Sequence, residues 1–194
     1  MDGLTTKQKI VEAALQTLKD EGFAGTSARA IARRGDFNQA LIFYHFGTLN
    51  DLLLAALDAT SAARMQRYET ELMEAGTLED KLKVATDLYR EDLASGHITV
   101  VSEMIAGSLS RPDLGPEIVA RLEPWVEFAE RMIAGALAGS FLESLIDPKA
   151  LAGAVVAMYL GVDLLSHLDG DRSRAEELFA MVERIAPMAM MLRG

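Results

Sequence analysis

The stretch that decides the fold is SARAIARRGDFNQALIFYHF, residues 27–46. Ser27 can accept a hydrogen bond from a free backbone N–H at the start of a short helix, and Gly35-Asp36 ends that helix. Asn38 can cap a second short helix over residues 39–44. Four apolar residues are spaced so that the two short helices can pack together: Ile31, Phe37, Ile42 and Phe46.

A longer helix precedes this pair. Thr5-Thr6-Lys7-Gln8 resembles a capping box, in which the first and last side chains cap the helix start, and Gly22 is expected to end the helix. Its apolar residues follow helical spacing: Ile10, Ala13, Ala14 and Leu18. The predicted order is a helix, a turn, a short helix, a second turn and a second short helix. This is the layout of a helix-turn-helix motif, which places its last helix in the DNA major groove.

Helical periodicity continues to the C-terminus, and no stretch alternates as a strand does. Further helices are expected over residues 49–74, 77–96, 98–109, 117–138 and 148–167, and from Ser173, where Pro187 should kink or shorten the last one. The sequence therefore predicts an all-α protein of about nine helices.

Charge is distributed unevenly along the 194 residues. The chain has 19 basic and 29 acidic side chains, giving a net charge of -10, but its first fifty residues hold six basic and five acidic ones. Nucleic acid would repel the acidic remainder and not the N-terminal quarter, so any contact with DNA is expected there.

Several protein classes are not expected. The chain has no cysteine, and its three histidines are scattered, with no HExxH, no phosphate loop and no GxGxxG motif. We therefore expect no enzyme activity, no metal and no cofactor. The longest uncharged apolar stretch, residues 150–162, is shorter than the ~18–20 residues that cross a bilayer, so a cytoplasmic protein without a membrane partner is expected.

The first 64 residues resemble the tetracycline-repressor (TetR) family of bacterial transcription regulators. The residues that carry the resemblance are Ile10, Ala13, Ala14, Gly22, Phe23, Thr26, Ser27, Ile31, Ala32, the run Leu41-Ile42-Phe43-Tyr44-His45-Phe46, and Leu52, Leu53, Ala55 and Leu57. The resemblance implies that these residues bind DNA: Thr26, Ser27, Arg29, Asn38, Gln39, Ala40, Leu41, Tyr44, His45 and Thr48.

Three residues depart from the family pattern. Phe43 stands where a tyrosine is usual and lacks its hydroxyl, Leu49 stands where a phosphate-contacting lysine is usual, and Asp36 replaces a common glycine. The helix over residues 39–44 also has no arginine or lysine, so the commonest bidentate contact with guanine would have to come from Arg29.

The resemblance also implies a DNA-binding domain over residues 4–64 and a ligand-binding and dimerisation domain over residues 65–194. The helices of the second domain carry two further sets of candidates. The family encloses a small-molecule effector there, and the corresponding lining residues are Met65, Tyr68, Tyr89, Glu103, Met104, Trp125, Phe128, Met132, Tyr159 and Asp163. Two helices have apolar residues at alternating spacings of four and three, which suits a partner helix and predicts a homodimer through Leu151, Val155, Met158, Val162, Leu165, Leu178, Val182 and Ile185.

Together these features predict a dimeric DNA-binding regulator, a repressor that a small molecule releases from a palindromic operator on double-stranded DNA. The alternative is a helical ligand-binding or interaction protein of the same fold that has lost specific DNA binding. Phe43, Leu49 and the acidic net charge favour that alternative.

Overall fold

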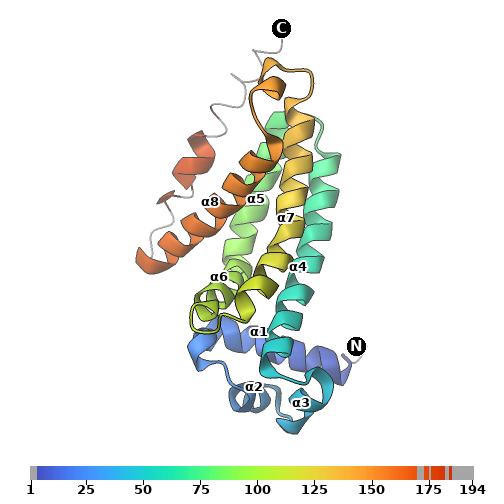
Figure 1. The fold of residues 1–194 in the computed structure, drawn as a ribbon, viewed down its shortest axis with the longest axis vertical. Coiled ribbons are helices and arrows are strands. Elements are labelled where there is room, and N and C mark those ends of the chain that lie inside the picture. The colour runs from blue at the N-terminus through green and yellow to red at the C-terminus, as the bar shows by residue number, and fades with distance from the viewer. Residues whose placement is uncertain (1–3, 170–172, 175, 182–183, 185–194) are drawn as a thin grey trace. The chain divides into compact units, whose positions relative to one another are not determined.

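The computed structural model describes residues 4–169, 173–174, 176–181 and 184 (Figure 1). These residues form helices and contain no strand, which confirms the all-α prediction. The elements are α1 (Thr6–Gly25), α2 (Ala28–Gly35), α3 (Ala40–Phe46), α4 (Leu49–Glu74), α5 (Leu78–Ser95), α6 (His97–Ser108), α7 (Leu114–Leu137), the 3-10 helix η1 (Phe141–Ser144) and α8 (Pro148–Asp169).

The expected last helix is described in part. Residues 173–174 and 176–181 are helical, as the sequence indicates. The expected dimer residues Val182 and Ile185, and the kink at Pro187, lie outside the described residues.

The chain divides into two compact units. Unit 1 is Met1–Arg64 with Gly96–Ala120, and unit 2 is Met65–Ser95 with Arg121–Gly194. The first segment of unit 1 ends at residue 64, and the division of the chain into two functional domains stays a prediction. Unit 1 also includes α6 and the start of α7, a long-range association that a linear division of the sequence cannot represent.

The core of unit 1 forms where the N-terminal helices meet. Ile10 and Leu18 of α1, Ile31 of α2 and Ile42 of α3 are fully buried, and α1–α3 lie together in the blue part of Figure 1. Burying each such aliphatic side chain stabilises the fold by roughly 1.5–3 kcal/mol. The expected capping box is present: Thr5 N–H donates to Gln8 Oε1 at 2.8 Å, and Gln8 N–H donates to Thr5 Oγ1 at 3.3 Å.

Gly22 interrupts α1 where the sequence predicts its end. Its φ of 67° lies in the left-handed region, which glycine adopts without steric cost, and a short turn of helix follows to Gly25. Phe23, directly after the interruption, packs against α6 at Gly107. A Cβ atom added at Gly107 would lie only 2.4 Å from the Phe23 ring. The ring and the helix can approach each other this closely only because residue 107 is a glycine.

Unit 2 contains α5, η1, α8 and the C-terminal parts of α4 and α7. Thr77 and Asp80 cap the start of α5: Asp80 N–H donates to Thr77 Oγ1 at 3.0 Å, and Thr77 N–H donates to Asp80 Oδ2 at 3.2 Å. This exchange lowers the pKa of Asp80 through the Thr77 hydrogen bonds. At α8, Asp147 Oδ1 accepts from Lys149 N–H at 3.0 Å, as the Asp-Pro sequence predicts.

α8 is more apolar than the uncharged stretch indicated. Residues 148–166 are long and apolar enough to pass as a membrane span by length and composition, with a mean hydropathy of 1.5, and 17% of that stretch is buried. α3 and α4, bent by 69°, pass the same test together. The uncharged stretch counted from the sequence, residues 150–162, is shorter because it ends before Asp163. A core helix of a protein outside the membrane passes the same test.

Candidate DNA interface and effector region

α3 exposes one face and buries the opposite one. Ile42 is fully buried, whereas Phe43 and Tyr44 are 49% and 81% exposed. Gln39 and Ala40, one turn earlier, are also exposed, while Leu41 and His45 are intermediate. The Tyr44 ring is therefore available for contact on the outer face of α3.

The turns on each side hold α3 in place. Asn38 Oδ1 accepts from Ala40 N–H at 2.9 Å, but the N-cap of α3 is Gln39, one residue later than expected. Asp36 adopts the left-handed conformation with φ 51°, which asparagine, aspartate and glycine tolerate best. A glycine is usual at this position for the same reason. At the other end Gly47 has φ 80°, and Lys7 lies 5.3 Å from the Phe46 ring centroid.

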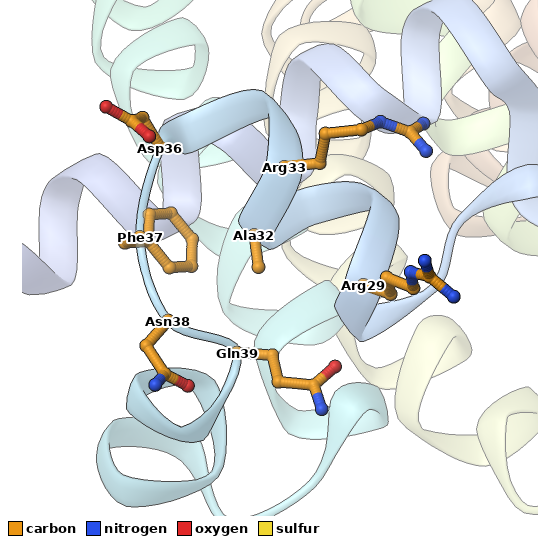
Figure 2. A pocket seen from close by; sticks show the side chains of 7 residues that line it. All are labelled: Arg29, Ala32, Arg33, Asp36, Phe37, Asn38 and Gln39. Atoms are coloured by element: carbon orange, nitrogen blue, oxygen red, sulfur yellow. The ribbon is translucent and has the colours of Figure 1, made fainter.

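An open depression lies between α2 and the start of α3 (Figure 2). In Figure 2 the side chains of Arg29 of α2 and Gln39 lie on one side of this depression, and the Phe37 ring lies on the other. One guanidinium and one amide are thus presented together beside the exposed face of α3, and these groups can read guanine and adenine respectively.

The other two arginines of α2 are engaged by α1. Arg34 forms ion pairs with Asp20 at 2.5 Å and Glu21 at 3.4 Å. The hydrogen bond to Asp20 is the main cause that raises the pKa of Arg34, and the bond to Glu21 adds to it. Arg33 lies 3.5 Å from Glu21. In the part of the chain that the structure describes, Arg29 forms no ion pair with an α1 carboxylate, and it lines the depression together with Arg33.

Two expected DNA-binding residues have structural partners. The Thr26 hydroxyl is buried and donates to Gly22 O at 2.6 Å, at the kinked end of α1. Thr48 caps α4, since its Oγ1 donates to Asp51 Oδ2 at 2.6 Å and accepts from Asp51 N–H at 3.0 Å. Ser27 caps α2 through Ala30 N–H at 3.2 Å and remains exposed.

The expected effector-lining residues fall into both units. Glu103 and Met104 belong to unit 1, where Glu103 Oε2 accepts from Phe23 N–H at 2.7 Å and Met104 is fully buried. The other candidates belong to unit 2: Met65, Tyr68, Tyr89, Trp125, Phe128, Met132, Tyr159 and Asp163.

The aromatic members of the unit 2 set contact one another. The ring centroids of Tyr68 and Trp125 are 5.4 Å apart, and those of Tyr89 and Tyr159 are 4.9 Å apart, both with edge-to-face geometry. Tyr68 also meets Phe128 at 6.5 Å. Met65 and Met132 are half-buried.

Sequence reasoning missed the residue that links these rings. Asp92 of α5 is 3% exposed, and its Oδ2 accepts from Tyr68 Oη–H at 3.0 Å and from Tyr159 Oη–H at 3.1 Å. A signal was available, because Asp92 follows the buried Tyr89 by three residues and therefore lies on the same side of α5.

The expected dimer residues of α8 are exposed to different degrees. Leu151, Val155 and Met158 are 37%, 36% and 39% exposed, and Leu165 is 48% exposed. Val162 is half-buried, and so is Leu178 further along the chain. Leu164 and Leu168, at 48% and 73%, extend the apolar surface of the same helix.

No group of three or more His, Asp or Glu residues in the described part of the chain could hold a metal ion.

Comparison with known proteins places the N-terminal region in a family. Residues 10–56 match the model of the bacterial regulatory proteins of the tetR family. The probable HTH-type transcriptional regulator YttP of Bacillus subtilis is 31% identical over 88 residues, which are 44% of this chain. The match spans 42% of the length of that relative.

The fold recurs in solved structures across nearly the whole chain. The regulatory protein TetR from Rhodobacter sphaeroides superimposes with a TM-score of 0.77 at 18% identity, over 91% of this chain and 96% of that one. A Saccharomonospora viridis protein in complex with choline superimposes with a TM-score of 0.74 at 21% identity, over 92% of this chain and 94% of that one. At these identities the likeness concerns the fold.

Proposed function

We propose that this chain, whose residues 10–56 match the bacterial regulatory proteins of the tetR family, is a transcriptional regulator that binds an operator on double-stranded DNA through α3. The observation that carries the proposal is the two-sided character of α3. Ile42 is buried in unit 1, while Gln39, Ala40 and Tyr44 face outward. A helix anchored in this way can enter a major groove without losing its contacts to the domain.

Base reading is assigned to the depression and the exposed face. Arg29 can donate to the O6 and N7 atoms of guanine, and Gln39 can bond to adenine. Tyr44, His45 and Leu41 provide hydroxyl, imidazole and apolar contacts beside them. Ser27 and Asn38 sit at helix starts, where backbone N–H groups favour phosphate oxygens. Thr26 and Thr48 lie next to the starts of α2 and α4, and for this reason both are kept in the proposed interface.

The regulator is proposed to act as a homodimer. Two copies of α3 must reach successive major grooves, about 34 Å apart or a multiple of that, and a twofold assembly achieves this on a palindrome. The apolar outer face of α8, with Leu151, Val155 and Leu165, is the proposed dimer surface. An apolar helix face of this length is covered in a stable protein, and a second copy covers it with no additional partner.

We assign the release of the repressor from DNA to a small-molecule effector that binds in unit 2. The structural relative from Saccharomonospora viridis holds choline, which supports a ligand-binding role for the corresponding part of this fold. An effector shifts the equilibrium only by its differential affinity for the DNA-bound and released conformations.

Binding selection tests the DNA function. The purified full-length chain is incubated with random double-stranded DNA, and the enriched sequences are measured by fluorescence anisotropy against a scrambled duplex. We expect an enriched palindrome, bound at least a hundredfold more tightly than the scrambled duplex. No enrichment over several rounds would overturn the proposal.

A second candidate function is a helical ligand-binding protein that does not bind a specific operator. The observation in its favour is Phe43, which is 49% exposed on the α3 face without the hydroxyl that the family usually presents. The same experiment separates the two candidates. Enrichment without a consensus sequence, together with ligand binding in unit 2, would favour the second.

A further inference from the structure

Lys7, in the first turn of α1, lies beside the last residue of α3. Its Nζ atom is 5.3 Å from the centroid of the Phe46 ring, which is within the range of a cation–π interaction. Both residues belong to unit 1, and the N-terminal end of α1 lies next to α3 in Figure 1. The fold thus brings a positive charge from α1 to the end of α3.

The surroundings of Lys7 differ from those of two α2 arginines. Arg34 lies 2.5 Å from Asp20, and Arg33 lies 3.5 Å from Glu21. Lys7 is exposed, and no carboxylate in the part of the chain that the structure describes forms an ion pair with it. An ammonium group has three N–H donors, and a ring face occupies only one side of it. The Lys7 ammonium group therefore keeps donors for an anion outside the protein.

Phe46 lies on the same side of α3 as Phe43, because residues three apart on a helix are neighbours. Phe43 is 49% exposed and stands where the family usually presents a tyrosine hydroxyl. Tyrosine hydroxyls and lysine ammonium groups both form hydrogen bonds with DNA phosphates. Lys7 therefore brings a phosphate-binding group to the side of α3 on which Phe43 lacks one.

The dimensions of the major groove determine what lies against this side of α3. The groove is about 12 Å wide, and a helix with its side chains is about 10–12 Å across, so phosphates line both sides of a helix that enters the groove. The buried Ile42 marks the side of α3 that faces the domain, and the exposed Ala40 and Tyr44 mark the side that faces the bases. Phe43 and Phe46 lie between these two sides, so they face a wall of phosphates.

We propose that Lys7 binds a DNA phosphate beside α3 and supplies the backbone contact that Phe43 cannot make without a hydroxyl. Phe46 is a positioning residue, since its ring holds the lysine side chain against the end of α3. A contact with the phosphate backbone adds affinity and salt dependence and does not select bases. The inference rests on the proposed operator binding through α3, and it adds a residue of α1 to that interface.

The first experiment compares Lys7→Gln with Lys9→Gln, which removes the same charge. Lys9 is exposed on α1 and projects about 200° around the helix from Lys7. Fluorescence anisotropy measures the affinity of the full-length variants for the selected operator at several salt concentrations. For each bound copy of the chain, Lys7→Gln should reduce the slope of log affinity against log salt by about one, and the affinity about fivefold at physiological salt. Lys9→Gln should have less than half of either effect, and equal effects of the two substitutions would overturn the assignment.

The second experiment separates a phosphate contact from a structural role of Lys7. Lys7→Arg keeps the charge and should retain the salt slope of wild type, and Lys7→Gln should leave the ratios of affinity among operators with single base changes as they are in wild type. Phe43→Tyr should raise affinity more in the Lys7→Gln protein than in wild type, because the two groups act on the same side of α3. A slope that Lys7→Arg does not retain, altered ratios, or additive effects of Phe43→Tyr and Lys7→Gln would contradict the proposal. Urea unfolding verifies that each variant is folded.

The same salt titrations on an unselected duplex make the test independent of operator selection. Binding to this duplex that Lys7→Gln weakens and Lys9→Gln does not, in a protein that selects no operator, would support the Lys7 contact and contradict the proposed regulator. Equal affinities and salt slopes of wild type and Lys7→Gln on a selected operator would support the regulator and overturn the role of Lys7. No binding of wild type to either duplex would overturn both.

Discussion

Glu103 and Phe23 are joined across eighty residues of sequence by a hydrogen bond from Phe23 N–H to Glu103 Oε2, 2.7 Å long. The acceptor lies on α6 and the donor follows the left-handed Gly22 of α1. One turn further along α6, Gly107 receives the Phe23 ring. Glu103 and Gly107 therefore hold the interrupted end of α1 from the same side of α6.

Removing this acceptor should destabilise unit 1. Glu103→Ala leaves the part-buried Phe23 N–H without its partner, which typically costs about 1–3 kcal/mol, and Glu103→Gln should lose less because its amide oxygen can still accept. The measurement is the midpoint of urea unfolding. Glu123→Ala, at an exposed position of α7, is the control, and equal midpoints for the two alanine variants would contradict the assignment.

Local sequence signals predicted the N-terminal elements well. The Thr5–Gln8 box and the break at Gly22 depend on neighbours within four residues, and the structure confirms both of them. The capping of α5 by Thr77 and of α8 by Asp147 follows from the same kind of signal. Such interactions are readable because the chain carries both partners close together.

Interactions between distant residues were not predictable in the same way. The sequence placed Glu103 among effector-lining residues, since it lies in apolar surroundings, but its partner is Phe23 in unit 1. It also gave no partners for Arg33 and Arg34, which carboxylates of α1 engage. Periodicity shows which face of a helix is buried, but it does not show which residue of a distant helix is the partner of a given side chain.

Tyr44 and His45 are expected to be required for operator binding and dispensable for folding. Tyr44 is 81% exposed, and its ring contacts His45 edge to face at 5.0 Å. Tyr44→Ala and His45→Ala should each abolish binding in a gel shift with the selected operator, while circular dichroism and unfolding midpoints stay close to wild type. Wild-type binding by both variants would refute the proposed role of α3.

Arg29 and Arg34 should differ in what they contribute to DNA binding. Arg29→Ala is expected to cost about 1–3 kcal/mol of operator affinity and to relax the base preference at one position. Arg34→Ala should instead weaken the contact between α2 and α1, because its guanidinium pairs with Asp20 and Glu21. Anisotropy against operators mutated at each position checks both expectations, and identical specificity profiles for Arg29→Ala and wild type would exclude base reading by Arg29.

The buried His97 should make the protein less stable in mild acid. Burial, with Arg64 and Lys19 nearby, lowers the pKa of His97 to about 3, and its Nδ1 lies 2.9 Å from Thr60 Oγ1. The unfolded chain takes up a proton near pH 6.5 and the folded protein does not, so stability falls as the pH drops below 6.5 and continues to fall towards 3.

The substitution His97→Asn removes this titration and keeps an acceptor for Thr60. Between pH 6.5 and 5 wild type should lose about 2 kcal/mol more unfolding free energy than the variant, from 1.4 kcal/mol for each pKa unit. Urea unfolding at half-unit steps of pH measures the difference. Parallel profiles would show that His97 is protonated in the folded protein or does not control this range.

The exposed side of α8 provides the last prediction, which concerns assembly. Leu165 and Leu151 lie fourteen residues apart on this side and are 48% and 37% exposed. In a dimer through α8, a glutamate at either position would place a charge in an apolar interface, which association cannot compensate. Leu165→Glu and Leu151→Glu should therefore sediment as monomers at micromolar concentration, where wild type sediments as a dimer.

A matched substitution separates assembly from general surface effects. Leu109, directly after α6, is 86% exposed, and Leu109→Glu should leave the dimer intact. Because operator binding requires two copies of α3, the α8 variants should also lose affinity for the palindrome while retaining the same weak binding to a half-site as wild type. A monomeric wild type would contradict the proposed dimer. A dimer that tolerates both glutamates would show that its interface does not involve this side of α8.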